Sequence, residues 1–265
     1  MEKQVALKTS VDVARIRRAC RVAERCLRLL KDQLKPGVTT AGLDRFAARF
    51  LEDNGAVSAL KGYRGYPGSI CTSVNNVAAH GVPSTQTLED GDVITIDITV
   101  GVGGWFGDAA WTYIVGQGSP DARRILKGAW AAGLAGVAAA KAGERLGSVG
   151  WAVQEAARKL GCAVLEDYVG HGIGRAMHED PIVPNFGQRN RGTRIVAGMT
   201  FTVEPIVSLG KPEARLSTDG WTLVTADGSL SAQFEHTVAI FRDYTEVLTF
   251  SDGDIGSYID FPPYF

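Results

Sequence analysis

Five residues that could bind metal stand in apolar or glycine-rich segments, where a charge or an imidazole is unusual: Asp97, Asp108, His171, Glu204 and Glu235. Asp97 lies between two isoleucines, and Glu204 precedes a proline at the end of an apolar run. Four carboxylates at one interior point repel one another unless a cation lies among them. The residue types therefore predict a site of four carboxylates and one imidazole that binds two metal ions. Taken one at a time, Glu204 and Glu235 are as compatible with a structural ion pair as with a metal site.

The two aspartates are predicted to face each other across a β-hairpin. Residues 101–104 form a glycine-rich turn signal between two segments that are rich in β-branched and aromatic residues. With Val102 and Gly103 as the loop, Asp97 lies directly opposite Asp108, and their Cβ atoms are about 4.5–5.5 Å apart. Bare carboxylates so placed repel each other, which favours a shared cation or one protonated acid. Two solvated aspartates at a sheet edge are the alternative.

The chain has four histidines, and three of them are candidates for the same site. His171 lies in a glycine-rich stretch, residues 170–174, where the backbone can approach closely and the imidazole is uncrowded. His178 follows seven residues later, and His80 lies in a loop after an apolar run. His236 is interpreted as a structural neighbour of Glu235. A hydrogen-bonded core histidine is the alternative interpretation for each.

Composition excludes several classes of function. The 265 residues carry a net charge of −1, so there is no electrostatic argument for a nucleic-acid or membrane partner. No apolar run is long enough to span a membrane, and no secretory leader is present at the start. The four cysteines lack metal-site spacing and are expected to be buried in a reducing cytoplasm. Motifs for nucleotide binding, a serine nucleophile elbow and a helical zinc-protease pair are also missing.

The elements expected around these residues occur twice. Residues 11–33, capped by Ser10, and residues 40–54 are predicted to be helices; strands are predicted at residues 93–100, 105–115, 200–207 and 233–241. The break at residues 35–37 recurs at 141–143, and Gly55 recurs as Gly161, 106 positions later. Asp97 and Glu204 follow at nearly the same offset. This spacing predicts one α+β domain, residues 1–265, of two related halves whose helices cover one face of a mostly antiparallel sheet.

An ordered set of motifs resembles the type I methionine aminopeptidases of the M24 metallopeptidases. The similarity spans about residues 9–240 and includes residues 63–67, 80–81, 96–97, 107–108, 170–174, 177–179, 201–205, 219–221 and 229–236. It implies the pita-bread fold with two pseudo-symmetric halves. Prolidase-like relatives need a large N-terminal domain for which this chain has no room. Only 26 positions separate His178 from Glu204, which favours type I over type II.

The resemblance also implies a role for each site residue. Asp97 would chelate one metal, Asp108 and Glu235 would bridge both, and His171 and Glu204 would hold the other. The metals would activate a water molecule, Glu204 would shuttle its proton, and His80 and His178 would position the peptide and stabilise the oxyanion. Five residues would line the pocket for an unbranched thioether side chain: Tyr63, Tyr66, Cys71, Met177 and Trp221.

The cofactors and partners follow from the same resemblance. The expected cofactors are two divalent ions, with Co, Mn, Fe and Zn all compatible. A monovalent cation is expected near Asn75, Val77 and Ser231. The expected substrates are N-termini of nascent proteins that begin with methionine and have a small second residue. A transient association with the ribosome is expected, without specific nucleic-acid or membrane binding, for a cytoplasmic monomer.

Four positions depart from the family pattern. Thr95 stands where relatives commonly have asparagine, Phe106 where they have histidine, Met177 where they have phenylalanine, and Leu60 where they have cysteine. These departures leave open a paralogue with a different preference for the first residue of the peptide. A non-catalytic peptide-binding module is a second alternative. Residues 243–265 form a C-terminal tail without an interpretation.

Overall fold

The computed structural model describes residues 5–251, and its first two helices follow the predicted pattern. Helix α1 (Ser10–Gln33) is followed by α2 (Thr40–Asp53), and Gly55 leaves α2 with a φ of 62°. The prediction that Ser10 caps this helix is wrong, because Ser10 is the first residue of α1. Thr9 takes that role because its hydroxyl accepts from the Asp12 N–H while the Asp12 carboxylate accepts from the Thr9 N–H, a reciprocal capping box.

The second half repeats the first. Helices α3 (Pro120–Ala139) and α4 (Leu146–Lys159) correspond to α1 and α2, and both ends of α4 lie 106 positions after those of α2. The break before each outer helix has one geometry, with φ values of 94° at Gly37 and 95° at Gly143. The Gly37 N–H donates to the Leu88 carbonyl, and the Gly143 N–H to the Ile195 carbonyl. The predicted duplication is confirmed.

Within residues 5–251, the main sheet has nine strands, and all of its pairings are antiparallel. Its order is β1-β4-β5-β14-β9-β7-β8, with β2 on β4 and β15 on β14. The bounds are Val57–Ser58 (β1), Cys71–Val74 (β2), Val93–Val102 (β4), Trp105–Ile114 (β5), Gly170–Gly172 (β7), Glu179–Val183 (β8), Thr200–Val203 (β9), Glu235–Ile240 (β14) and Thr245–Val247 (β15).

Two predicted strands are each broken in two. Residues 200–207 divide into β9 and β10 (Ile206–Ser208). Residues 233–241 divide between the last residue of a further strand, β13 (Ser231–Gln233), and β14. Strands β10 and β13 join β6 (Ala163–Val164) in a second sheet, and β3 (Val77–Ala79), β11 (Ala214–Leu216) and β12 (Leu223–Thr225) form a third. Glu204 and Glu235 stand where the chain leaves or enters the main sheet, so the breaks occur at the predicted ligands.

The register of the β4–β5 hairpin corrects one prediction. Val102 pairs with Trp105, so the loop is Gly103-Gly104 rather than Val102-Gly103. Both central residues of the favoured two-residue turn need positive φ, and the two glycines have φ values of 58° and 76°. Asp97 consequently pairs with Ala110, not with Asp108. The shift keeps both aspartates on one face, where they are diagonal neighbours.

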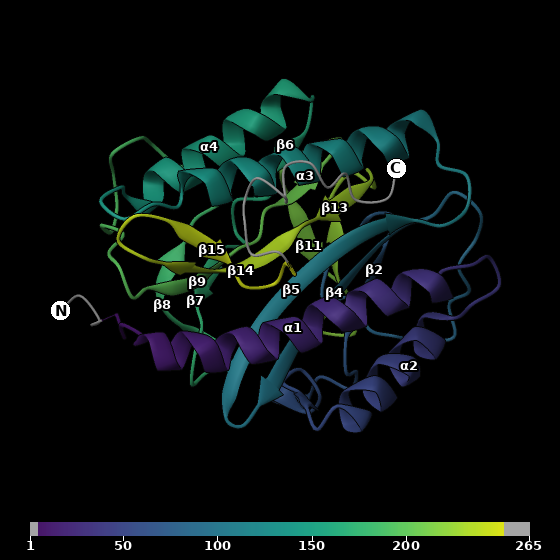
Figure 1. Ribbon diagram of the computed structural model, residues 1–265. Helices are drawn as coiled ribbons and strands as arrows, with labels where there is room; N and C mark the ends of the chain where they lie inside the picture. Colours follow the sequence, from purple (N-terminus) through teal and green to yellow (C-terminus); the bar gives the residue numbers. More distant parts are fainter. Residues whose placement is uncertain (1–4, 252–265) are drawn as a thin grey trace.

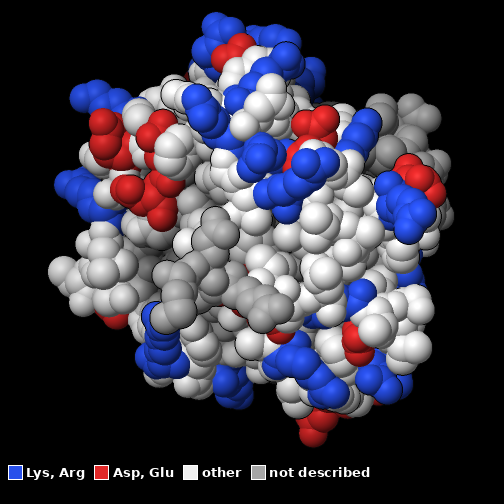
Figure 2. All heavy atoms as spheres, turned by 90° about the vertical axis from the view of Figure 1, so that its left-hand side faces the viewer, with Lys and Arg blue, Asp and Glu red and all other residues white. Residues whose placement is uncertain are grey.

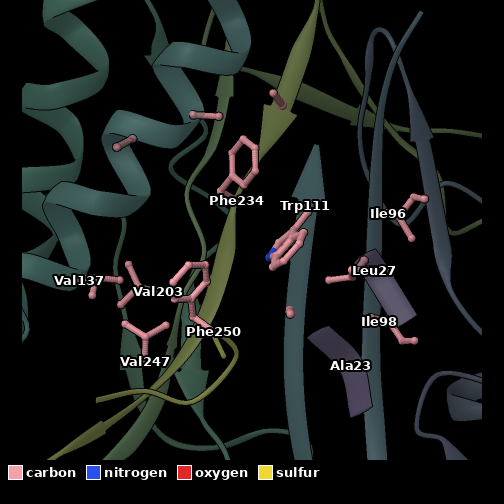
Figure 3. Close-up of a cluster of buried hydrophobic side chains, with 14 of the residues drawn as sticks. Ala23, Leu27, Ile96, Ile98, Trp111, Val137, Val203, Phe234, Val247 and Phe250 are labelled. Carbon is pink, nitrogen blue, oxygen red and sulfur yellow. The ribbon is translucent and has the colours of Figure 1, made fainter. Parts of the chain in front are cut away.

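The four α-helices of the described part of the chain cover one face of the sheet, with α1 on β4 and β5 and α3 on β14 (Figure 1). One continuous apolar cluster lies between these layers and draws on both halves of the chain. Figure 3 shows part of this cluster, with Leu27 and Trp111 from the first half and Val203 and Phe234 from the second. Trp105 and Trp111 are buried, and all four free cysteines are buried, as predicted.

Part of the predicted C-terminal tail packs on the body. Strand β15 pairs with β14, and Phe250 is buried in the core. The Ser251 N–H donates to the buried Glu24 carboxylate, 2.8 Å away, and the Ser251 hydroxyl donates to the same oxygen. Residues 252–265 of the tail lie outside the described residues. Among residues 5–251, none of the helices is both long and apolar enough to cross a membrane.

Candidate metal centre

The fold brings the five predicted ligands to one cavity of about 510 Å³. Asp97 and Asp108 come from β4 and β5, and His171 from β7. Glu204 follows β9, and Glu235 is the first residue of β14. Because β5 pairs with β14 at the centre of the main sheet, the carboxylates of both halves meet there.

The distances among these side chains suit metal binding. Ligand atoms of Asp108, His171 and Glu235 all lie within 4.8 Å of one another. His171 Nε2 is 3.5 Å from Glu204 Oε1 and 3.9 Å from Asp108 Oδ2. Asp97 stands beside Asp108 in the sheet, and its carboxylate contributes to the raised pKa values of Glu204 and Glu235. Donor atoms at these separations can share one or two cations.

The electrostatics indicate that the site needs positive charge. Burial, and then the nearby Asp108 carboxylate, raise the pKa values of Asp97 and Glu235 well above the ordinary range. Burial also raises the pKa of Glu204 well above its ordinary value. It raises the pKa of Asp108 to about 6, although a hydrogen bond from Thr99 opposes the shift. Ionised carboxylates are therefore unfavourable here without a cation.

Two observations test whether the residues fit a metal. Glu235 Oε1 is buried, and among the described residues it has no hydrogen-bond partner. An orphaned carboxylate oxygen in a protein interior needs a cation or a proton donor. Burial also lowers the pKa of His171, so its imidazole is neutral and can donate a lone pair to a metal. The donor set therefore fits divalent metal ions.

Two threonines support the predicted ligands, and sequence reasoning missed both. The Thr99 hydroxyl donates to Asp108 Oδ1 at 2.8 Å, and the Thr202 hydroxyl donates to Glu204 Oε1 at 2.6 Å. Such hydrogen bonds orient a carboxylate toward a metal. A signal was present in the sequence, because Thr99 stands two residues after Asp97 and Thr202 two before Glu204. Positions two apart share one face of a strand.

The other two candidate histidines lie against the predicted ligands and the pocket wall. The His178 ring is 4.4 Å from that of His171 and nearly perpendicular to it, and His178 Nδ1 is 3.2 Å from the Tyr63 hydroxyl. His80 lies beside Tyr168, with ring centroids 6.3 Å apart. Burial lowers the pKa values of both His178 and His80, and each is lowered further by a neighbouring histidine. Both imidazoles are therefore neutral donors or acceptors at pH 7.

His236, which sequence analysis set apart as structural, is buried and its Nδ1 lies 2.8 Å from the Thr249 hydroxyl.

All five predicted pocket residues line the cavity, and so does Leu60. Tyr66 meets Trp221 edge to face, with ring centroids 5.1 Å apart. The Tyr66 hydroxyl donates to the Gly81 carbonyl at 3.0 Å, which ties the pocket wall to the loop of His80. Arg64, Asp167 and Tyr168 also line the cavity, and sequence analysis did not select them. Thr95 and Phe106 are not among the lining residues; Thr95 instead shares a hydrogen bond with Thr112.

Two of the three residues predicted to hold a monovalent cation are in direct contact. The Ser231 N–H donates to the Asn75 carbonyl at 2.8 Å, and Asn75 has a positive φ of 55°. Val77 begins β3, two residues after Asn75. The Asn75 side-chain amide donates to Asp92, and its oxygen accepts from the Val93 N–H, so the amide is held at both ends.

Comparison with known proteins agrees with this geometry. A family model described as metallopeptidase family M24 matches residues 14–241. The chain belongs to metallopeptidase family M24. Its M24 relatives include the methionine aminopeptidase of Rickettsia prowazekii, 39% identical over 261 residues that cover 98% of this chain and 99% of the relative. Methionine aminopeptidase 1 of Bacillus subtilis is 40% identical over 92% of this chain and 99% of its own length.

Solved structures of M24 proteins show the same fold. The crystal structure of the Rickettsia prowazekii methionine aminopeptidase matches with a TM-score of 0.92 at 39% identity, over 93% of this chain and 100% of that one. Prolidase from Pyrococcus furiosus matches with a TM-score of 0.74 at 21% identity, over 92% of this chain and 65% of that one. The second similarity concerns the fold alone. Together they confirm the predicted pita-bread fold.

Proposed function

We propose that this M24 chain is a metal-dependent aminopeptidase that removes the initiator methionine from nascent proteins whose second residue is small. One observation carries the proposal: two buried carboxylates, two half-buried carboxylates and a neutral imidazole meet in a cavity walled by Tyr66, Cys71, Met177 and Trp221. The relatives named methionine aminopeptidase, about 40% identical over nearly the whole chain, support it. The residues 1–265 would act as a single catalytic domain.

The predicted ligands would divide two divalent metal ions between them. Asp97 would hold one ion, His171 and Glu204 the other, and Asp108 and Glu235 would contact both. Mixed carboxylate and imidazole donors suit Mn²⁺, Fe²⁺, Co²⁺ or Zn²⁺. When bound, such ions lower the pKa of a water molecule and polarise a carbonyl group. A monovalent cation near Asn75, Val77 and Ser231 would stabilise the neighbouring sheet edge.

The remaining site residues would orient the peptide and move a proton. Glu204, whose carboxylate is held by Thr202, would take up and return the proton of the attacking water. When the Tyr63 hydroxyl donates to His178 Nδ1, the ring proton stays on Nε2. His178 and His80, both neutral, would then donate to the oxygen of the scissile peptide bond as negative charge develops there.

The pocket explains a preference for methionine. An unbranched thioether fits between aromatic rings, and sulfur–aromatic contacts are worth about 0.3–1.5 kcal/mol. Tyr66 and Trp221 supply such rings, while Cys71 and Met177 add polarisable walls. Leu60 and Met177, the two departures that line the cavity, support a second candidate: a paralogue with a changed preference at the first residue. A non-catalytic binding module has less support, because all five predicted ligands are present.

The proposed setting is the cytoplasm, where the chain would act as a monomer on nascent N-termini. Transient association with the ribosome is part of the proposal. Arg189, Arg191 and Arg194 are exposed and close together in the sequence. Because the net charge is −1, contact with a polyanion would depend on local groups of basic side chains, such as those that stand among acidic ones on the face shown in Figure 2. Co-sedimentation with ribosomes at increasing salt tests this point.

The test of the function is hydrolysis of the peptide Met-Ala-Ser by metal-loaded protein. We expect release of free methionine, complete loss of release on chelation, and much slower release from Met-Leu-Ser. A panel with leucine, norleucine or alanine in place of methionine distinguishes the paralogue from the main proposal. Metal-loaded protein that releases no residue from any of these peptides would overturn both enzyme proposals and leave the binding module.

A further inference from the structure

The segment between β7 and β8 carries two pocket residues on a short irregular loop. Residues 174–178 connect the strand of His171 to β8, which begins at Glu179. Met177 and His178 line the cavity from this loop. The position of both side chains therefore depends on what holds the loop from outside the cavity.

The Glu179 carboxylate closes the loop by three hydrogen bonds. Its Oε1 accepts from the Arg175 N–H at 2.6 Å and from the Ala176 N–H at 3.0 Å. Its Oε2 accepts from Lys8 Nζ at 2.6 Å, across 171 positions of sequence. The two side chains are only 6% and 15% exposed, so this ion pair is largely shielded from water.

Lys8 is itself anchored before α1. Its N–H donates to the Gly198 carbonyl at 2.7 Å, and its ammonium group also donates to the Ala6 carbonyl at 2.7 Å. Gly174 leaves the room for this arrangement, because a Cβ there would lie 2.4 Å from Lys8 Cε and 2.9 Å from Glu179 Oε1. The close approach of the lysine to the loop thus requires glycine at this position.

The tip of the β4–β5 hairpin holds the same loop from a second side. The Phe106 N–H donates to the Gly174 carbonyl at 2.9 Å. The Arg175 guanidinium lies 4.3 Å from the centre of the Trp105 ring. Lys8 and Glu179 complete this support, and neither of them lines the cavity.

We propose that Lys8 and Glu179 are positioning residues, and that their ion pair holds residues 174–178 so that Met177 and His178 keep their places in the cavity. The inference rests on the proposed function for its kinetic consequence. Without the lysine, a shielded carboxylate loses its countercharge and its hold on the loop. A misplacement of about 1 Å in a site can cost about 100-fold in rate. His171 and Asp108 lie on strands, so metal binding does not depend on this pair.

The experiment compares Lys8→Met with a matched control, Arg17→Met. Arg17 makes an equally short ion pair, 2.6 Å and 2.8 Å from the oxygens of Glu246, between α1 and β15 and away from the cavity. We expect Lys8→Met to lower kcat for Met-Ala-Ser by about 10- to 100-fold with unchanged bound metal. Lys8→Arg should keep kcat within about threefold of the wild-type value. Arg17→Met should leave kcat unchanged and lower Tm by about as much as Lys8→Met does.

Hydrogen exchange separates this inference from the proposed function. The amides of Arg175 and Ala176 should exchange faster in Lys8→Met and not in Arg17→Met, whether or not the wild-type protein is a peptidase. If Lys8→Met does not fold, Glu179→Gln, which keeps an acceptor for both amides, provides the same two readouts. Wild-type kcat and wild-type exchange in the variant, or an equal loss in Arg17→Met, would overturn the proposal. Failure of the wild type to cleave any peptide would overturn the function instead.

Discussion

The two halves of the sheet present their carboxylates in different ways. In the first half, Asp97 and Asp108 lie inside two regular ten-residue strands, β4 and β5. In the second half, Glu204 follows β9 and Glu235 begins β14, at points where the chain changes sheets. The regular hairpin provides a rigid pair of acids. The broken strands provide acids at points where the chain passes between two sheets.

The strands that lie beside the acid-bearing strands also differ between the two halves. β2 lies beside β4 and β7 lies beside β9, so they occupy equivalent places in the duplicated sheet. β2 pairs Cys71 with Asp97, whereas β7 places His171 3.5 Å from Glu204. Burial raises the pKa of the Cys71 thiol well above its usual value, so it stays protonated and is a poor ligand. At these equivalent places the first half therefore presents a thiol that lines the pocket, and the second half presents the imidazole.

The largest effect should come from His171→Ala. This change removes the one imidazole among the predicted ligands, and we expect peptidase activity to fall by more than about 100-fold, since even outer residues of metal sites cost 10–100-fold. The metal bound per chain, measured by atomic emission, should fall with it. Undiminished metal binding in this variant would show that the carboxylates alone bind the metal. The imidazole would then not distinguish the second half from the first.

Metal affinity should fall steeply with acidity. The raised pKa values of Asp97, Glu204 and Glu235 leave protons on these groups in the metal-free fold, and Asp108 joins them below about 6. Metal must displace these protons, so affinity should drop at least tenfold for each pH unit lowered near neutrality. The same shifts affect the stability of the metal-free fold. Because the pKa values are raised in the folded state, these groups favour folding only while they are protonated, and the free energy of unfolding falls as pH rises.

Calorimetric titration with Mn²⁺ in buffers of different ionisation enthalpy measures the displaced protons. We expect at least about one proton released per chain at pH 7. Binding without proton release would mean that the four carboxylates are already ionised, and the electrostatic description of the site would be wrong.

The two supporting threonines offer a matched pair across the halves. Thr99→Val and Thr202→Val each remove one hydrogen bond to a predicted ligand and keep the side-chain shape. We expect metal affinity to fall by about 10- to 100-fold in each. Thr202→Val should have the larger effect, because its hydroxyl also accepts from the His171 N–H at 3.0 Å. A larger loss of metal affinity in Thr99→Val than in Thr202→Val would indicate that the acid in the regular hairpin contributes more to metal binding.

The smallest effect concerns Cys71→Ala. Since the thiol is assigned to the pocket wall, the substitution should raise KM for Met-Ala-Ser by about 2- to 10-fold, the value of a sulfur–aromatic contact. Bound metal and kcat should change little. A loss of metal comparable to that in His171→Ala would make Cys71 a ligand, and the contrast between the flanking strands would disappear.

Much of this arrangement could be predicted from sequence, and the failures have identifiable causes. The helices, the repeated break at Gly37 and Gly143 and the sites of the acids follow local patterns. The hairpin register was wrong by one loop position, although the demand for positive φ at Gly103 and Gly104 favoured the observed turn. The strand break at Glu204 reflects a change of sheet, which no local pattern signals.

Contacts between distant segments were beyond sequence reasoning. Lys8 and Glu179 are 171 positions apart, and neither has an unusual local context. Arg64 and Asp167 reach the cavity from separate loops, and only the folded chain brings them there. Motif analysis finds residues whose type is unusual in its segment, and it misses ordinary polar residues that become important through tertiary contact.

The most direct test of the proposed two-metal aminopeptidase is reconstitution of metal-stripped protein with Mn²⁺, Fe²⁺, Co²⁺ or Zn²⁺, one metal at a time. Metal bound per chain and methionine released from Met-Ala-Ser are measured in the same samples. We predict no release from the stripped protein, and release that appears as metal binds, with at most two ions per chain. A chain that binds metal at this site and releases no methionine from any peptide with a small second residue would contradict the account.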